Sequence, residues 1–430
     1  MGKIRGVRLG SLLLAVMLLV ACGRGQSVGQ QSEPQQQTQA GSEERTGQNG
    51  GTASGELRLG VLTSFTGEFG PYGQSWLNAT KMAVEEMRQA GWPLGREVQL
   101  YVEDDGTKPE IGIRGAQKLI GGNQVSAIIG PTSSIVLGIL DYAKQNQVVV
   151  VSHAAGTTKL DELGGDYVYR TVASDSFEGR VAAQFIRDQN IQDAVMMYEI
   201  NESTTSLAKV FEEDFAAAGG SVKKMIAFNP GQTSYQSEIR EAMSENPSII
   251  FLASGIDSGS KIIRGSYQQG YSGKWLLSGD MATSEMFSLV GPGILEGAWV
   301  ETPGTTEDSP NYKRYADLYR QTYNEDPGPY SAPFYDAVVA VGLAMEASGD
   351  GSGPGINRAM REIANPPGVK VTTIAEGLAE LRKGNDIDYD GVSGPVDFDD
   401  SGTVPASYQI QQARGDRWEQ VHVYPADFWE

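Results

Sequence analysis

The segment LRLGVLTSFTGEFGPYGQSWLNATKMAVEEM, residues 57–87, joins two patterns that together decide the fold. Residues 57–62 alternate apolar and polar positions, which predicts a strand. From residue 73 to residue 87, apolar side chains recur at helical spacing, which predicts a helix. A strand that leads directly into a helix is the repeating unit of parallel α/β proteins.

The same alternation continues along the chain. We expect further strands at residues 98–102, 127–130, 148–152, 194–198, 222–228, 249–253 and 275–278, and helices at 111–120, 136–143, 206–218, 235–244 and 258–269. After residue 302 we expect helices at 310–324 and 330–348, and short strands at 396–398, 408–411 and 419–423. A single hydrophobic core stops growing when a chain reaches about 250–300 residues, so a longer chain divides into domains. The pattern therefore predicts an α/β protein with two doubly wound parallel-sheet lobes.

The N-terminus has the layout of an export signal. Basic residues at positions 3, 5 and 8 precede an apolar run at 9–20, which is too short to span a bilayer. The string Leu19-Val20-Ala21-Cys22 looks like a bacterial lipobox, which implies that Cys22 is lipidated; the alternative is an ordinary signal peptide in which Cys22 is incidental. We expect a signal at 1–22 and, from its polar composition, a flexible linker at 23–55.

The amino-acid composition argues against several classes of function. The net charge of −20, from 34 basic and 54 acidic residues, argues against binding to nucleic acid or to anionic membrane surfaces. No apolar run after Cys22 approaches the roughly 20 residues of a membrane helix, so we expect membrane attachment only through a lipid. The two histidines have no metal-site spacing, and no nucleophile elbow or phosphate-binding string is present. We therefore expect no enzyme activity, no metal and no cofactor.

Several motifs carry a family resemblance when taken in order. They are TSFTGEFGPYG (63–73), IIGPTSS (128–134), VVSHAAGTTKL (150–160), LLSGD (276–280), FYDAVVAVGLAM (334–345), SGPVDFDDSG (393–402) and YQIQQ (408–412). From residue 57 to about residue 423, the chain resembles the ABC-transporter substrate-binding proteins of the leucine/isoleucine/valine type, a branch of the type I periplasmic binding proteins.

The resemblance implies a two-lobed receptor with three crossings between the lobes. Carried onto this chain, lobe 1 covers residues 56–172 plus 305–393, and lobe 2 covers 173–304 plus 394–430. A small-molecule ligand would lie between the lobes, at the carboxyl ends of the strands. The protein, expected to be a monomer, would then deliver its ligand to ABC permease subunits.

The turn after strand 127–130 is the first candidate site. Ser133 and Ser134 open a predicted helix, whose free N–H groups and partial positive charge suit a carboxylate. A serine in this place can equally be only the N-cap of the helix. In the family that the chain resembles, the serine at the place of Ser134 binds the ligand carboxylate, which favours the binding role.

The turn after strand 148–152 is the second candidate site. The resemblance implies that a small residue and a threonine there contact the carboxylate and the ammonium of the ligand. Ala154 and Ala155 fit the small-residue role, but an ungapped match places Gly156 at the threonine position, with Thr157 one step away. We interpret His153 as a loop spacer rather than a group that transfers protons.

Three further positions follow from the resemblance. Asp280 matches a carboxylate that pairs with the ligand α-ammonium, although the branched-chain binders have the longer glutamate there; an acidic turn residue is the alternative. Tyr72 matches a tyrosine that forms a wall of the side-chain pocket, and a packed surface ring is the alternative. Tyr330 and Phe334, near the start of the helix at 330–348, either line the cleft or join the core.

The expected lid of lobe 2 departs from the family pattern. Ser203 stands where the family commonly has an aromatic residue, and the loop around Gly255 lacks the aromatic pair of the branched-chain binders. These changes favour a small amino acid, an amide or a urea-like solute over a strictly leucine-like ligand. Two other functions stay open: a ligand sensor of the same fold that acts in signalling, and, more remotely, an extracytoplasmic hydrolase.

Overall fold

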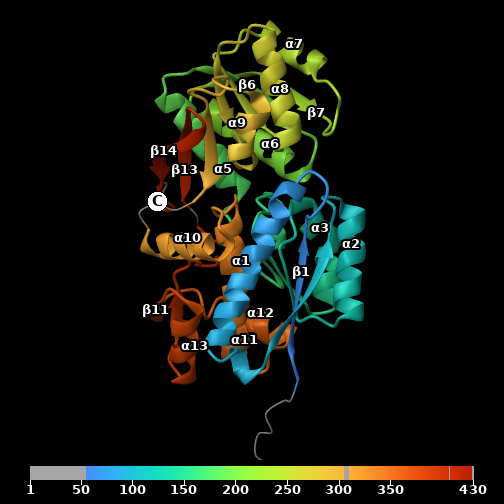
Figure 1. Ribbon diagram of the computed structural model, residues 1–430, viewed down its shortest axis with the longest axis vertical. Helices are drawn as coiled ribbons and strands as arrows, with labels where there is room; N and C mark the ends of the chain where they lie inside the picture. The colour runs from blue at the N-terminus through green and yellow to red at the C-terminus, as the bar shows by residue number, and fades with distance from the viewer. Residues whose placement is uncertain (1–54, 305–308, 406, 429–430) are drawn as a thin grey trace, which may run out of the picture. The chain divides into compact units, whose positions relative to one another are not determined.

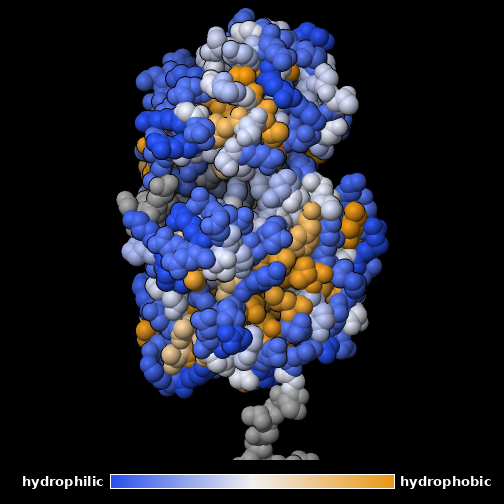
Figure 2. Space-filling view, in the orientation of Figure 1, coloured by the Kyte–Doolittle hydropathy of each residue, from blue (hydrophilic) through white to orange (hydrophobic). Residues whose placement is uncertain are grey.

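The computed structural model describes residues 55–304, 309–405 and 407–428. The predicted signal, Cys22 and almost all of the predicted linker lie outside the described residues. No helix in the described ranges is long and apolar enough to cross a membrane. Hydrophilic residues cover most of the face seen in Figure 2.

The first sheet is parallel throughout, with strand order β2-β1-β3-β4-β5. Its strands are β1 (Leu57–Thr63), β2 (Val98–Asp104), β3 (Ala127–Ile129), β4 (Val149–Ser152) and β5 (Val168–Arg170). Helices α1 (Gly70–Gln89) and α11 (Ser331–Ser348) share a core with one face of this sheet. Helices α2 (Pro109–Gln117) and α3 (Ser133–Gln145) share a core with the other face (Figure 1).

The second sheet has the strand order β14-β13-β10-β9-β8-β6-β7. Its strands are β6 (Asp193–Glu199), β7 (Ser221–Phe228), β8 (Ile249–Ala253), β9 (Lys274–Leu277), β10 (Trp299–Pro303), β13 (Tyr408–Arg414) and β14 (Arg417–Tyr424). Strands β6 to β10 run parallel, and β13 and β14 form an antiparallel hairpin at one edge.

Helices cover both faces of the second sheet as well. Helices α5 (Asp175–Asp188) and α6 (Glu202–Ala217) share a core with one face. Helices α7 (Gln236–Ser244), α8 (Ile256–Gln268) and α9 (Ser284–Val290) share a core with the other (Figure 1). The predicted fold class, two doubly wound α/β lobes, is confirmed.

Shorter elements complete the fold. They are α4 (Leu160–Leu163), α10 (Pro310–Tyr323), α12 (Gly353–Ala359), α13 (Ile374–Arg382), the two-stranded sheet of β11 (Val369–Val371) and β12 (Ile387–Tyr389), and 3₁₀ turns at Pro93–Gly95 and Gly279–Met281. The chain leaves the first sheet for the second after β5, leaves the second sheet after β10, and returns to it after β12. The lobe boundaries given above stay a prediction.

Three local expectations differ from the structure. The expected strand at 396–398 is wrong: Val396 and Phe398 are each 1 % exposed, but the Phe398 N–H donates to Asn365 Oδ1 at 3.0 Å. The alternating pattern there records buried side chains of a loop. The helix expected at 111–120 ends at Gln117 and continues as a π-helical turn, Lys118–Gly122. The sequence pattern also missed α5, because its polar first turn obscures the apolar face that follows.

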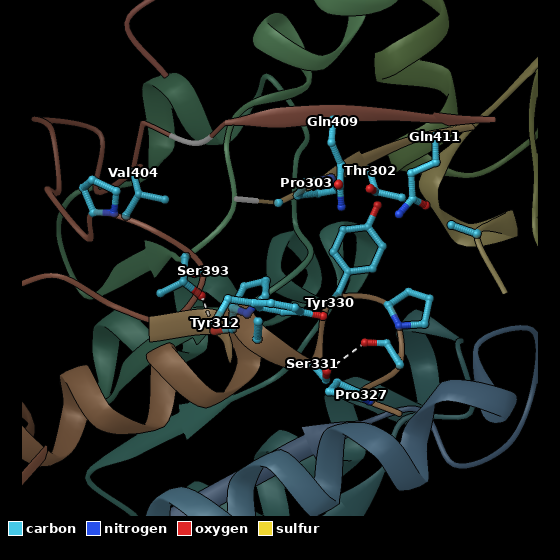
Figure 3. A pocket seen from close by; sticks show the side chains of 18 of the residues that line it. Thr302, Pro303, Tyr312, Pro327, Tyr330, Ser331, Ser393, Val404, Gln409 and Gln411 are labelled. Atoms are coloured by element: carbon cyan, nitrogen blue, oxygen red, sulfur yellow. Dashed lines mark hydrogen bonds between the residues drawn. The ribbon is translucent and has the colours of Figure 1, made fainter. Parts of the chain in front are cut away.

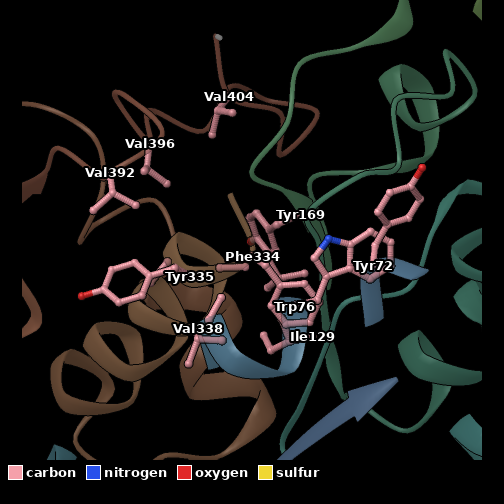
Figure 4. Close-up of a cluster of buried hydrophobic side chains, with 14 of the residues drawn as sticks. Tyr72, Trp76, Ile129, Tyr169, Phe334, Tyr335, Val338, Val392, Val396 and Val404 are labelled. Atoms are coloured by element: carbon pink, nitrogen blue, oxygen red, sulfur yellow. The ribbon is translucent and has the colours of Figure 1, made fainter. Parts of the chain in front are cut away.

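An aromatic cluster joins α1 to α11 (Figure 4). Trp76 stacks on Phe334 with 6.3 Å between ring centroids, and its Nε1 donates to the Pro329 carbonyl at 2.8 Å. His153 lies 4.4 Å from both rings, and neither of its nitrogens has a hydrogen-bond partner among the described residues. Burial lowers the pKa of His153 to about 3. His153 and Phe334 are therefore packed core residues.

Arg170, at the end of β5, is 1 % exposed and organises the loop after β4. Its Nη1 donates to the carbonyls of Ala155, Gly156 and Thr157 at 3.1, 3.0 and 3.0 Å. Its Nη2 pairs with Asp161, and its Nε donates at 2.7 Å to Thr403 Oγ1, in the segment that leads to β13. One buried cation thus connects the loop to the third crossing.

We predict that Arg170→Met lowers the free energy of unfolding by about 3–5 kcal/mol, because it removes the cation that pairs with Asp161 and leaves the Ala155 carbonyl without a donor among the described residues. Urea unfolding measures this change. Arg320→Met is the matched control: Arg320 is exposed and pairs with Asp317 and Asp326 on the surface, so its loss should cost less than about 1 kcal/mol. Equal effects of the two substitutions would contradict the role given to Arg170.

Candidate functional site

Loops at the carboxyl ends of both sheets surround a cavity of about 280 Å³. The first sheet contributes the loops after β1, β2, β3 and β4, and the second sheet contributes those after β6, β7 and β9. The start of α5 and the residue before α11 complete the lining. Ligands of parallel α/β sheets bind outside the carboxyl ends of the strands, so this cavity is the candidate site.

Helix α3 points its N-terminus at the cavity. Its N-cap residue is Thr132, in an extended conformation and without a side-chain capping bond, so neither serine is the N-cap. Ser133 and Ser134 follow as the first helical residues, and both line the cavity. The Ser133 hydroxyl is buried and has no hydrogen-bond partner among the described residues. This helix terminus therefore offers N–H groups and hydroxyls to an anionic group of a ligand.

Of the four residues that the sequence predicted as ligand contacts in the loop after β4, only two line the cavity. Ala154 and Gly156 line the cavity, whereas Ala155 is fully buried and does not. Thr157 also does not line it, because its hydroxyl donates to Glu202 Oε1 at 2.8 Å. A side chain on Gly156 would overlap Asp175 Oδ1. The Asp175 carboxylate therefore fills the space beside Gly156, and the Thr157 hydroxyl is hydrogen-bonded to Glu202.

Asp280 enters the cavity from the second sheet. It lies in the 3₁₀ turn after β9 and is partly buried. Burial, and then the nearby Glu199, raise the pKa of Asp280 to about 7. Tyr72 donates its hydroxyl to the Asp280 backbone carbonyl, but its ring is 4 % exposed and does not line the cavity. Tyr72 thus holds the backbone of Asp280 in place. Its ring also packs against Trp76, with 5.6 Å between the ring centroids, and Trp76 does line the cavity.

The two nominated lid residues behave differently. Ser203 lines the cavity at the start of α6. Gly255 does not: its N–H donates to Glu199 Oε2 at 2.9 Å, and a side chain on it would overlap Glu68 Oε1. Glu68, from the loop after β1, therefore packs against the loop after β8, and this contact joins the two sheets at one side of the cavity.

Sequence reasoning missed several residues that line the cavity. They are Glu68, Phe69, Trp76, Asp175, Glu178 and Glu202, and Tyr330 was left undecided between cleft and core. The stretch SDSFE (174–178) could have signalled two of them, but an N-cap serine followed by acidic residues is also the ordinary start of a helix. The structure has this cap: the Ser174 hydroxyl accepts the Ser176 N–H at 3.2 Å.

The ionisable side chains that line the cavity are all acidic. No Lys, Arg or His of the described residues lines it. Burial raises the pKa of Asp175 to about 7 and that of Glu178 to about 8. Burial and the neighbouring Glu199 raise the pKa of Glu68 to about 10, and burial raises that of the fully buried Glu301 well above its usual value. The carboxyl groups here lack the cations that normally accompany buried acids.

A second cavity, of about 160 Å³, lies beside the segments that connect the sheets. In Figure 3, Gln409 and Gln411 from β13 and Thr302 from β10 lie on one side of the Tyr330 ring. Tyr330 lines both cavities, so its ring is a wall common to them. The residue has a left-handed backbone conformation with φ of 58°, which turns the chain sharply into α11.

Comparison with known proteins gives a consistent answer. A family described as periplasmic binding protein matches residues 56–417. The Leu/Ile/Val-binding protein BraC3 of Rhizobium johnstonii is 23 % identical over 300 residues, which cover 69 % of this chain and 81 % of that protein.

Two solved structures share the fold. A leucine-binding protein LivK from Thermotoga maritima has a TM-score of 0.75 and 23 % identity, over 86 % of this chain and 99 % of that one. The branched-chain amino acid transporter substrate-binding protein LivJ from Streptococcus pneumoniae, in complex with isoleucine, has a TM-score of 0.74 and 19 % identity, over 85 % and 99 %.

These three relatives are binding proteins rather than enzymes. The family is extracytoplasmic, which agrees with the expected export. The family model spans most of the chain, and the resemblance to the leucine/isoleucine/valine type is confirmed. The chain therefore belongs to the periplasmic binding protein family.

Proposed function

We propose that the protein captures a small amino acid or amide between its two lobes and delivers it to the permease subunits of an ABC transporter. One observation carries the proposal: opposite partners for a zwitterion line a single cavity. Ser133 and Ser134, at the N-terminus of α3, belong to the first sheet's loops, and Asp280 follows a strand of the second sheet.

The chemistry of each partner supports this assignment. An α-carboxylate would accept N–H groups of α3 and the unpaired Ser133 hydroxyl. An α-ammonium would pair with the Asp280 carboxylate. Relatives named for leucine, isoleucine and valine binding make an amino acid the first class of ligand to test. The cavity, of about 280 Å³, is near the lower end of the usual range for small-molecule sites, which suits a solute of that size.

Binding without reaction requires only that a ligand prefer the closed arrangement of the lobes. A ligand held by α3 on one side and by Asp280 on the other has contacts with both lobes only when they are together. It would therefore shift the population toward closure. The closed receptor, acting as a monomer, would then present both lobes to the permease.

The proposal includes a lipid anchor on Cys22, with residues 23–55 as the linker to the body. We expect Cys22→Ala to move the protein from the membrane fraction to the soluble fraction, because no other anchor is proposed. Fractionation of the native bacterium, with the unaltered protein as control, measures this shift. A variant that stays with the membrane would rule out the lipid anchor.

We expect purified protein to be stabilised by its amino acid or amide ligand, by about 2.7 kcal/mol at a ligand concentration of 100 Kd. Thermal-shift screening against amino acids, amides and urea measures this. Asp280→Asn should then weaken binding about tenfold to hundredfold, because a charge-assisted hydrogen bond is lost, and Ser134→Ala should weaken it up to about tenfold.

Ser237→Ala and Asp317→Asn, at exposed positions outside the cavity, are the matched controls for these substitutions. Unchanged affinity in both Ser134→Ala and Asp280→Asn would exclude the assigned site. Delivery to a permease has its own test: loss of the protein should abolish uptake of the identified ligand by whole cells, and normal uptake would contradict it.

We also predict that the ligand-free protein loses stability as the pH rises from about 5 to about 8. Asp175, Glu178 and Asp280 have folded-state pKa values of about 7, 8 and 7, raised above those of an unfolded chain, about 3.9 for Asp and 4.3 for Glu. In this pH range the folded protein binds more protons than the unfolded chain, so unfolding becomes easier as protons are removed.

Melting temperature measured against pH tests this sign. Asp175→Asn combined with Glu178→Gln should flatten the dependence, because two of the responsible groups no longer titrate. Glu212→Gln combined with Glu213→Gln removes the same charge from exposed positions of α6 and should leave the slope unchanged. A melting temperature that rises with pH across this range would contradict the prediction.

A further inference from the structure

The cavity contains more carboxyl groups than a zwitterion with one ammonium group can neutralise. Five line it: Glu68, Asp175, Glu178, Glu202 and Asp280. Glu202 is neutralised, since Lys159 Nζ lies 2.9 Å from its Oε2. None of the other four forms an ion pair with any residue in the described part of the chain.

Two of these groups, Asp175 and Glu178, form a pair on the first turn of α5. They are three residues apart and therefore face the same side of the helix. Asp175 is 2 % exposed, and its Oδ2 has no hydrogen-bond partner among the described residues. Glu178 is 7 % exposed and accepts the Tyr408 hydroxyl at 3.0 Å. The pair thus presents unused acceptor capacity toward the cavity.

The nearest protein cation does not fill this role. Ser206, through a hydrogen bond, and Arg170, through its charge, both lower the pKa of Asp175, but the donors of Arg170 bind Asp161, Thr403 and the loop carbonyls. The burial of Asp175 outweighs both effects, so the pKa of Asp175 is still raised. Glu301, whose charge acts on both members of the pair, is fully buried, and neither of its carboxyl oxygens has a hydrogen-bond partner among the described residues, so it adds no positive charge.

A structural role at the helix start does not account for the pair. Acidic residues in the first turn of an exposed helix stabilise it only weakly. Taking two carboxyl groups out of water without a cation costs more than this, whether they are buried as carboxylates or kept protonated. The helix start therefore does not account for the burial of both groups. Glu68 is a different case, because its carboxyl group packs against Gly255 in the loop after β8 and joins the two sheets.

We propose that the ligand is a basic amino acid, whose side chain carries a second cationic group that binds between Asp175 and Glu178. This inference rests on the proposed function, because the α-carboxylate and α-ammonium take the places at α3 and Asp280 described above. Phe69, Trp76 and Tyr330 also line the cavity, and an aromatic ring attracts a cation that lies over its face.

Matched ligand pairs test the proposal on the purified full-length protein. Arginine and citrulline differ by a guanidinium against a ureido group, and lysine and norleucine differ by an ammonium group against a hydrogen atom on the same terminal carbon. Isothermal titration should find the cationic member of at least one pair bound about tenfold to hundredfold more tightly, the range expected for a charge-assisted hydrogen bond.

Two variants locate the preference. Glu178→Gln and Asp175→Asn should each bring the ratio of affinities within the preferred pair toward one, while binding of the neutral member stays within a few-fold. That neutral binding also reports that the variant is folded. Glu212→Gln, which removes one exposed charge from α6, should leave the ratio unchanged and so exclude a general effect of net charge.

The outcomes separate this inference from the proposed function. Tight binding of neutral amino acids without a cationic preference, or a preference that survives both variants, would overturn the inference and leave the proposed function in place. Binding of no amino acid or amide at all would overturn both. Equal binding of agmatine and arginine would support the cationic subsite and overturn the assignment of the α-carboxylate to α3.

Discussion

The geometry of the site depends on the buried guanidinium of Arg170. It donates to the carbonyls of residues 155–157 and so holds the loop after β4, in which Gly156 leaves room for Asp175. The same group binds Thr403, in the segment that returns to the second sheet. A buried cation that pairs with a carboxylate and donates to several carbonyls is hard to replace, because an apolar side chain supplies neither the charge nor the donors. The loop, the start of α5 and the third crossing are therefore positioned together.

Around this fixed point, the cavity combines two kinds of electrostatic partner. The N-terminus of α3 supplies dipoles and hydroxyls for an anion, and it does so without any formal positive charge. The same cavity holds the acids Asp280, Asp175 and Glu178. None of these three acids forms an ion pair among the described residues, and our proposal is that a cationic ligand supplies the counter-charge. In that proposal, specificity follows from how many cationic groups the ligand carries, and less from the apolar surface that branched-chain side chains would need.

Much of this could be predicted from the sequence, and the failures have physical causes. Periodicity located most strands and helices, and the family resemblance located Ser134 and Asp280, both of which line the cavity. The same reasoning nominated Tyr72 as an aromatic wall of the pocket and Thr157 as a neighbour of the matched threonine position, but neither residue lines the cavity. The strand expected at 396–398 is a loop, because alternation of buried side chains does not reveal whether a neighbouring strand is present.

The sequence alone determined the alternating α/β architecture, the family and the positions of the loops that follow the strands, because these properties depend on local periodicity and on short motifs. Only the tertiary structure decided which side chains meet at those loops. In the sequence, Asp175 and Glu178 are the ordinary acidic start of a helix. They become part of a ligand cavity because Gly156 lacks a side chain and Tyr408, far along the chain, packs against Glu178. Contacts between distant segments set burial, and burial determines whether an acidic residue is a helix cap or half of a binding site.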